Sequence, residues 1–122
     1  MTIVIRRREK SIVSIEKPQN GDGILTFKKI LNGVEELDNK GRAFNHCFLE
    51  PNSGLGYHKH IGITETMYIL KGKAKYIAEN DNETILNPGD TTFTDNGQGH
   101  SIYGMSEESL EFIALVLFKG EE

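Results

Sequence analysis

Three histidines and one glutamate have the residue types and the spacing of metal ligands. His58 and His60 are two residues apart in the stretch GLGYHKHIGITETMYILKG, which runs from Gly54 to Gly72. Side chains alternate between the two faces of an extended strand, so both imidazoles would project from the same side. Glu65 follows after four residues, of which Gly62 is a flexible break, and it opens a second run that is typical of a strand. The carboxylate can therefore fold back beside the two rings.

His100 supplies the third imidazole from a separate segment, LNPGDTTFTDNGQGHSIYG. A turn, a short strand and a glycine-rich corner precede His100, which begins a further strand. With His100 pointing inward, Ile102 and Gly104 share its face. We therefore predict that three neutral imidazoles and one carboxylate converge on a divalent ion, with octahedral positions left for water or substrate. The predicted metal ligands are His58, His60, Glu65 and His100.

This ligand set is compatible with several ions, and manganese, iron, nickel, zinc and cobalt all stay open as the cofactor. A divalent ion against one carboxylate leaves the site with a net charge of about +1, which favours an anionic oxygen ligand and Lewis-acid chemistry. A small carboxylate or hydroxy-acid is therefore the expected partner.

Apolar side chains are expected to line the pocket beside this ion. Met67 and Ile69 share the parity of Glu65, and Phe112 lies on the last predicted strand. Plain core packing is the alternative for each residue, although together they would form a small apolar pocket. The predicted lining residues are Met67, Ile69, Ile102, Gly104 and Phe112. Tyr57 and Tyr76 carry phenols that could approach the ion, but neither is assigned to the site.

Short strands are the elements that must position these side chains. From residue 42 onward, glycine, proline and asparagine separate short runs of β-branched and aromatic residues, with no helical period. Such spacing is typical of an all-β sandwich or barrel. Strands are predicted over Ile24–Ile30, Arg42–Glu50 and Leu110–Phe118. The last run has apolar residues on both parities, which predicts a central strand.

Length and composition predict a single domain over residues 1–122, with N-terminal strands at about 1–16 and a barrel core at about 42–118. The net charge of −4 argues against nucleic acid as a partner. No run is apolar and long enough to span a membrane, and the N-terminus lacks the order of a signal peptide. We expect a cytoplasmic location.

Two further residues with reactive side chains are interpreted as structural. Cys47 is the only cysteine, so no intrachain disulfide can form, and its apolar strand predicts a small buried hydrophobe. His46 lies away from both histidine segments, and we expect it at the surface or at a subunit interface.

The two histidine segments together resemble the motifs of the cupin superfamily. The first motif has His-x-His, a glutamate and then a glycine, and His58, His60, Glu65 and Gly72 match it, although its leading glycine is displaced. The second motif is matched by Gly89, Gly97 and His100. Asp95 replaces its proline, and Gly104 replaces its asparagine, which leaves the pocket wall without an amide there.

The resemblance implies a double-stranded β-helix, or jelly-roll, barrel and supports the metal-ligand assignment. Among cupins the chain looks most like small single-domain proteins described as oxalate-decarboxylase-like, a description of similarity and not of activity. A homodimer is also expected, because the N-terminal runs and the closing strand would offer unpaired edges that a second copy can cover.

Two classes of function stay open. The first is an enzyme, a metal-dependent lyase or decarboxylase, isomerase or oxygenase acting on a small carboxylate. Proton transfer needs a positioned acid or base, and the pocket has no second assigned carboxylate or histidine. In the decarboxylating cupins a glutamate on a mobile lid has this role, and no matching segment is recognisable here. The alternative is a non-catalytic module that binds a metal or a small molecule.

Overall fold

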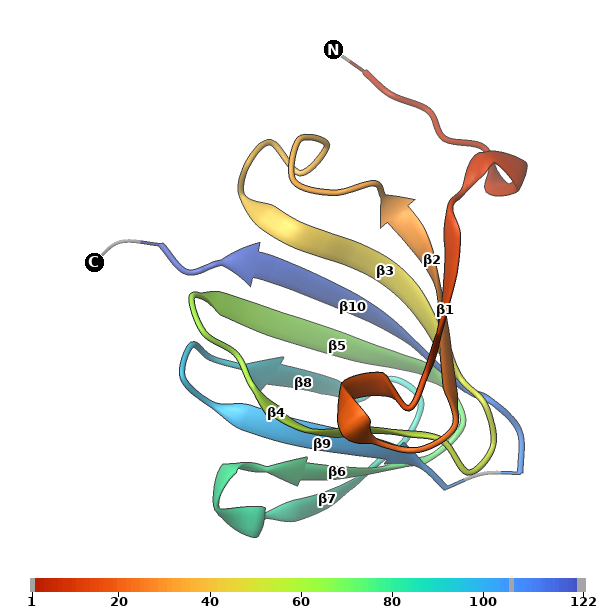
Figure 1. The fold of residues 1–122 in the computed structure, drawn as a ribbon, viewed down its shortest axis with the longest axis vertical. Helices are drawn as coiled ribbons and strands as arrows, with labels where there is room; N and C mark the ends of the chain where they lie inside the picture. The colour runs from red at the N-terminus through yellow and green to blue at the C-terminus, as the bar shows by residue number, and fades with distance from the viewer. Residues whose placement is uncertain (1, 106, 121–122) are drawn as a thin grey trace.

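Two antiparallel β-sheets make up the structure (Figure 1), a computed structural model that describes residues 2–105 and 107–120. The described residues form ten strands and three short 3-10 turns, with no α-helix among them. The strands are β1 (Ile12–Glu16), β2 (Ile24–Leu31), β3 (Gly41–Leu49), β4 (Gly54–Lys59), β5 (Ile63–Lys71), β6 (Ala74–Ala78), β7 (Glu83–Leu86), β8 (Thr91–Thr94), β9 (Gly99–Gly104) and β10 (Leu110–Phe118). The 3-10 turns are η1 (Arg7–Glu9), η2 (Pro18–Asn20) and η3 (Glu79–Asp81). The predicted all-β jelly-roll class is confirmed.

The strand order shows how the sheets face each other. The six-stranded sheet has the order β1-β2-β3-β10-β5-β8, and the four-stranded sheet has the order β4-β9-β6-β7. The closing strand β10 lies between β3 and β5, as its apolar residues on both parities predicted. A central strand is hydrogen-bonded to a neighbouring strand on both sides. The expectation that β10 would offer an edge to a second copy is therefore wrong.

The N-terminal segment differs from the sequence-based expectation. The sequence predicts strands at about 1–16, and only the last part of this segment forms one, as β1 paired with β2. Residues 2–6 form no strand and lead into η1, beyond the end of β2 in Figure 1. Met1 lies outside the described residues. The β propensity of residues 2–6 is not expressed because no neighbouring strand lies beside them to complete a ladder.

Alternation along the strands builds the core between the sheets. On β5, Met67 and Ile69 are buried, whereas Tyr68 and Leu70 between and beyond them are exposed. The same period brings the inward residues of β3, β6, β9 and β10 together, because every second side chain faces the same way. The buried cluster consists of Leu25, Cys47, Leu49, Met67, Ile69, Ala74, Tyr76, Leu86, Ile102, Leu110, Phe112 and Ala114. Within the described residues, no helix is long and apolar enough to cross a membrane.

Candidate metal centre

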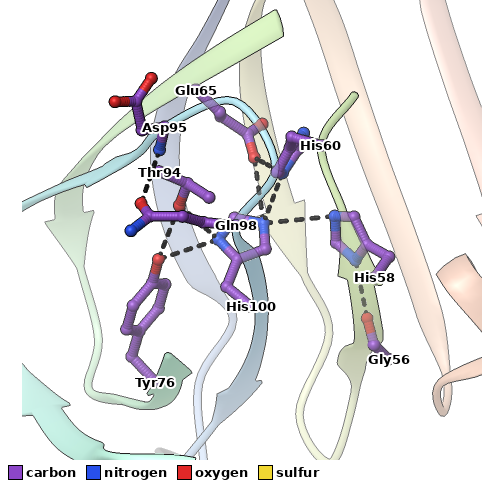
Figure 2. A network of polar contacts seen from close by, with 9 residues as sticks. All are labelled: Gly56, His58, His60, Glu65, Tyr76, Thr94, Asp95, Gln98 and His100. Atoms are coloured by element: carbon purple, nitrogen blue, oxygen red, sulfur yellow. Dashed lines mark hydrogen bonds and ion pairs between the residues drawn. The ribbon is translucent and has the colours of Figure 1, made fainter. Parts of the chain in front are cut away.

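Four potential ligands come from three strands and one loop junction. His58 lies on β4 and His100 on β9, and these two residues are direct partners in the β4–β9 ladder. Glu65 lies on β5 of the opposite sheet, and His60 follows the end of β4. The side chains of all four point toward one another in Figure 2. The structure therefore brings together the four residues that the sequence motifs single out.

The ligand atoms are close enough to share one ion. His100 Nε2 lies 3.0 Å from His60 Nε2 and 3.2 Å from His58 Nε2. Glu65 Oε1 lies 3.2 Å from both His60 Nε2 and His100 Nε2. One ligand atom from each of the four residues lies within 4.8 Å of every other. The group is thus positioned for metal binding.

The donor set also fits a divalent ion chemically. Two ligand atoms at right angles on an ion with bonds of about 2.1 Å are about 3.0 Å apart, close to the separations seen here. Where neither nitrogen of a facing imidazole pair carries a proton, the two lone pairs repel each other, and a cation between them removes that repulsion. Three nitrogens and one carboxylate oxygen suit a first-row transition metal.

The backbone near η2 sets the tautomer of His58. The carbonyl of Gly56 can only accept, so the 2.7 Å contact means that His58 Nδ1 carries a proton and donates it. Nε2 of the neutral ring then keeps its lone pair for a metal. Position 56 requires glycine because the backbone of η2 passes close to it, and a Cβ there would lie 2.3 Å from the carbonyl oxygen of Gln19.

A hydroxyl pair sets the tautomer of His100 in the same way. Tyr76 Oη lies 2.9 Å and Thr94 Oγ1 lies 3.0 Å from His100 Nδ1, and the two oxygens are 2.9 Å apart. With Nε2 facing the other ligands, Nδ1 donates its proton to these oxygens. Metal-binding histidines commonly donate their second nitrogen in this way, which fixes the ring orientation.

The corner before His100 replaces the proline of the family motif by side-chain hydrogen bonds. The amide of Asp95 donates to Oε1 of Gln98 at 3.0 Å, and the amide of Gln98 donates to the carbonyl of Asp95 at 3.1 Å (Figure 2). The same loop holds His60, whose amide donates to the carbonyl of Gln98 at 3.0 Å. This corner therefore positions both His60 and His100.

Electrostatics keep these ligands in the protonation states that metal binding needs. Burial alone raises the pKa of Glu65, but the neighbouring His100 and His60 rings outweigh it and lower the pKa to about 2. Burial is the main cause that lowers the pKa of His58, with a smaller opposing effect from the Gly56 carbonyl. At neutral pH the carboxylate is ionised and the His58 ring is neutral.

A cavity of about 420 Å³ opens beside the four ligands. Of the residues predicted to line the pocket, Met67 and Phe112 do so, and Ile69, Ile102 and Gly104 do not. Ile69 and Ile102 are fully buried, and each lies two residues further along its strand than Met67 or His100, which line the cavity. Gly104 lies at the far end of β9, beside the carbonyl of Ser53.

The cavity wall also contains residues that the motifs did not indicate. Polar and charged residues of η2, β3 and β4 contribute to it, namely Gln19, Arg42, Asn45 and Lys59. Tyr76, left unassigned from the sequence, bonds to a ligand histidine, whereas Tyr57 is exposed. Side-chain alternation along β6 could have predicted that Tyr76 faces the site only if the pairing of β6 with β9 had been known.

Cys47 and His46 are not part of the four-residue ligand group. Cys47 is buried, and burial, with a smaller effect of the Glu65 charge, raises its pKa to about 12. It lines the cavity wall, as well as filling the core as predicted. His46 lies on the outer face of the six-stranded sheet, where its Nε2 is 2.6 Å from Glu111 Oε1.

Residues 45–117 match the family model described as Cupin domain. The oxalate-binding protein of Thermotoga maritima is 34% identical over 115 residues, which cover 94% of this chain and 93% of that protein. A crystal structure from Thermotoga maritima, described as a predicted oxalate decarboxylase, superposes with a TM-score of 0.88 at 33% identity. It covers 96% of this chain and 100% of the other.

More distant solved structures show the same fold. KdgF from Halomonas has a TM-score of 0.70 at 14% identity, with 94% of each chain covered. A sugar phosphate isomerase from Silicibacter pomeroyi has a TM-score of 0.73 at 14% identity, covering 96% of this chain and 76% of the other. At such identities the likeness concerns the fold alone.

Proposed function

The chain belongs to the cupin family, and from this premise we propose that it binds a divalent transition metal and, beside it, a small carboxylate or hydroxy-acid. The observation that carries the proposal is the convergence of the His58, His60 and His100 Nε2 atoms and Glu65 Oε1, with the contacts to His100 at 3.0–3.2 Å. A metal held there supplies Lewis-acid polarisation of a bound oxygen. The relative named as an oxalate-binding protein supports a small anion as the ligand.

Binding without turnover is the function that the cavity chemistry supports best. Glu65, a metal-ligand candidate, is the only carboxylate among the described residues that line the cavity. Cys47 cannot act as a nucleophile near neutral pH, because its pKa is raised to about 12. General acid–base catalysis needs a further group within reach of the substrate. Among the described residues that line the cavity, no second carboxylate is available for proton transfer, so we propose that these residues bind and orient an anion.

The deciding experiment combines binding and turnover. Chelator-treated protein is reloaded separately with manganese, iron, nickel, zinc or cobalt and titrated with oxalate and glycolate by calorimetry, then incubated with ¹³C-oxalate and followed by NMR. The proposal expects metal-dependent binding and no formate or carbon dioxide. Formation of those products identifies a decarboxylase instead, and failure to bind any metal refutes the proposed site.

We also propose that two copies associate through the outer face of the six-stranded sheet. On this face Ile113 lies between His46 and Tyr68 in one cross-strand row, and Leu115 lies beside Phe44 in another. Tyr68 is exposed at 44%. Exposed and half-buried apolar side chains gathered on one face of a small protein favour burial against a partner.

A further inference from the structure

The charge around the cavity differs from that of the whole chain. The chain carries a net charge of −4, yet Arg42 and Lys59 outnumber Glu65 among the charged residues of the cavity wall. A divalent cation at the ligand group would make this excess of positive charge larger. A cavity with positive charge at two separate places favours an anion with two charged groups over one with a single charge.

We propose that Arg42 is the second anchor of the ligand and selects dianions, in particular short dicarboxylates. This inference rests on the proposed function, because the first anionic group would be taken up by the divalent ion that the ligand histidines and Glu65 would hold. Arg42 would bind the other carboxylate through its planar, forked guanidinium, which matches the two oxygens of that group.

A break in the strand register places Arg42 at the cavity. Val116 of β10 pairs with Ala43 and Leu117 pairs with Gly41, so Arg42 is the extra residue of a β-bulge. Bulges interrupt the alternation of side chains and re-aim the residues beside them. As a result, Arg42 lines the metal-site cavity and an adjoining cavity of about 170 Å³.

The guanidinium is available for a ligand. Among the described residues, Arg42 has no hydrogen-bond or ion-pair partner, and the side chain of Asn45, on the same stretch of cavity wall, has none either. Asn45 can add an amide donor beside the guanidinium. An unpaired arginine next to an unpaired amide is a suitable receptor for a carboxylate.

The distance to the ligand group suits a short molecule. Ala43 pairs with Val116, and Val116 pairs with Glu65, so the backbones of Ala43 and Glu65 are two strand spacings, roughly 10 Å, apart. The long side chain of the neighbouring Arg42 can span much of this gap. We expect the remaining space to suit two carboxylates joined directly or through one or two carbons.

Lys59 is the competing cation, and its position makes it the weaker candidate. It lies between His58 and His60 in the sequence, so strand alternation directs it away from the face that carries the two imidazoles. Its ammonium is also a point charge, without the paired donors that a carboxylate matches.

The test measures affinity by calorimetry on manganese-loaded protein, with oxalate, malonate and succinate as dianions and acetate as the monoanion. We expect Arg42→Gln to lower the affinity for the most tightly bound dianion by about tenfold to a hundredfold. The affinity for acetate should stay within about fivefold of the parent's. The affinity of Arg42→Lys for dianions should lie between those of the parent and Arg42→Gln. Arg8→Gln, an exposed change of the same charge outside the cavity wall, is the matched control and should behave as the parent. Metal content of each variant is measured in parallel.

Each outcome has a defined meaning. An equal loss for dianions and acetate in Arg42→Gln, or a larger dianion loss in Lys59→Gln, overturns the role of Arg42. Dicarboxylate binding that Arg42→Gln leaves intact overturns this inference alone. Absence of carboxylate binding by the parent loaded with each of the five metals in turn overturns the proposed function and this inference together.

Discussion

The hydroxyl of Tyr76 lies 2.9 Å from Nδ1 of His100, on the edge of the ring opposite the Nε2 that faces the other ligands. Tyr76 comes from β6, the neighbour of β9 in the four-stranded sheet. A phenol in this position orients the ring and keeps its proton on Nδ1. Tyr76 therefore supports the metal site without touching the ion.

Tyr76→Phe should lower metal affinity by about tenfold to a hundredfold, because the ring loses one of its two hydroxyl partners. Competition titration against a chelating dye measures the change. Tyr57→Phe is the matched control, since that phenol is exposed and has no hydrogen bond to a ligand histidine. Equal affinities for Tyr76→Phe and the parent would show that Thr94 alone orients the ring.

His100→Ala should remove most of the bound metal, because it deletes the nitrogen that lies closest to the other three ligand atoms. Elemental analysis of protein purified under identical conditions gives the metal content per chain. His46→Ala is the control, because His46 pairs with Glu111 on the outer face of the sheet. Metal content unchanged by His100→Ala, or lost equally in both variants, would contradict the assigned site.

The metal-free protein should lose stability as the pH falls below about 6.5. The pKa of His58 is lowered in the folded state, mainly by burial, so the unfolded chain takes up a proton that the folded chain resists. The free energy of unfolding then falls by up to about 1.4 kcal/mol for each unit of difference between the two pKa values. Glu65 acts in a lower window, because its pKa is about 2 and its contribution is lost only below about pH 4.5.

Urea unfolding in the presence of a chelator, from pH 8 to pH 5, checks this prediction. His58→Asn should flatten the dependence over that range, because the titrating ring is gone. A pH slope that the variant keeps in full would assign the effect to other groups.

The thiol of Cys47 should react very slowly with Ellman's reagent in the folded protein. Burial and the nearby charge of Glu65 raise its pKa to about 12, so roughly one thiol in ten thousand is ionised at pH 8. The chain has no other cysteine, so the rate reports this site alone. Reaction in urea provides the fast reference, and equally fast labelling of the folded protein would show that Cys47 is accessible and ionised.

Light scattering after size exclusion should give the mass of two chains. Tyr68→Lys places a charge in the middle of the proposed interface and should produce the monomer. Ile85→Lys alters an equally exposed apolar residue, at 44%, on the four-stranded sheet, and should leave the dimer intact. A monomeric parent, or dissociation by both variants alike, would refute the proposed face.

The strand pattern and the ligand types were readable from the sequence because both are short-range properties. The two-residue step from His58 to His60 and the run of residues 110–118 each lie within one strand, where alternation decides which face a side chain occupies. The same reasoning failed for residues 2–6, whose composition favours a strand that has no partner in the fold.

By itself, the sequence determined which side chains can act as ligands and that they lie on short strands. Only the tertiary structure decided that Glu65 of one sheet meets His100 of the other, that Tyr76 holds that ring, and that a bulge places Arg42 at the cavity. The physical reason is that strand pairing joins residues distant in the chain, and no short window of sequence encodes which strands become neighbours or where their register shifts.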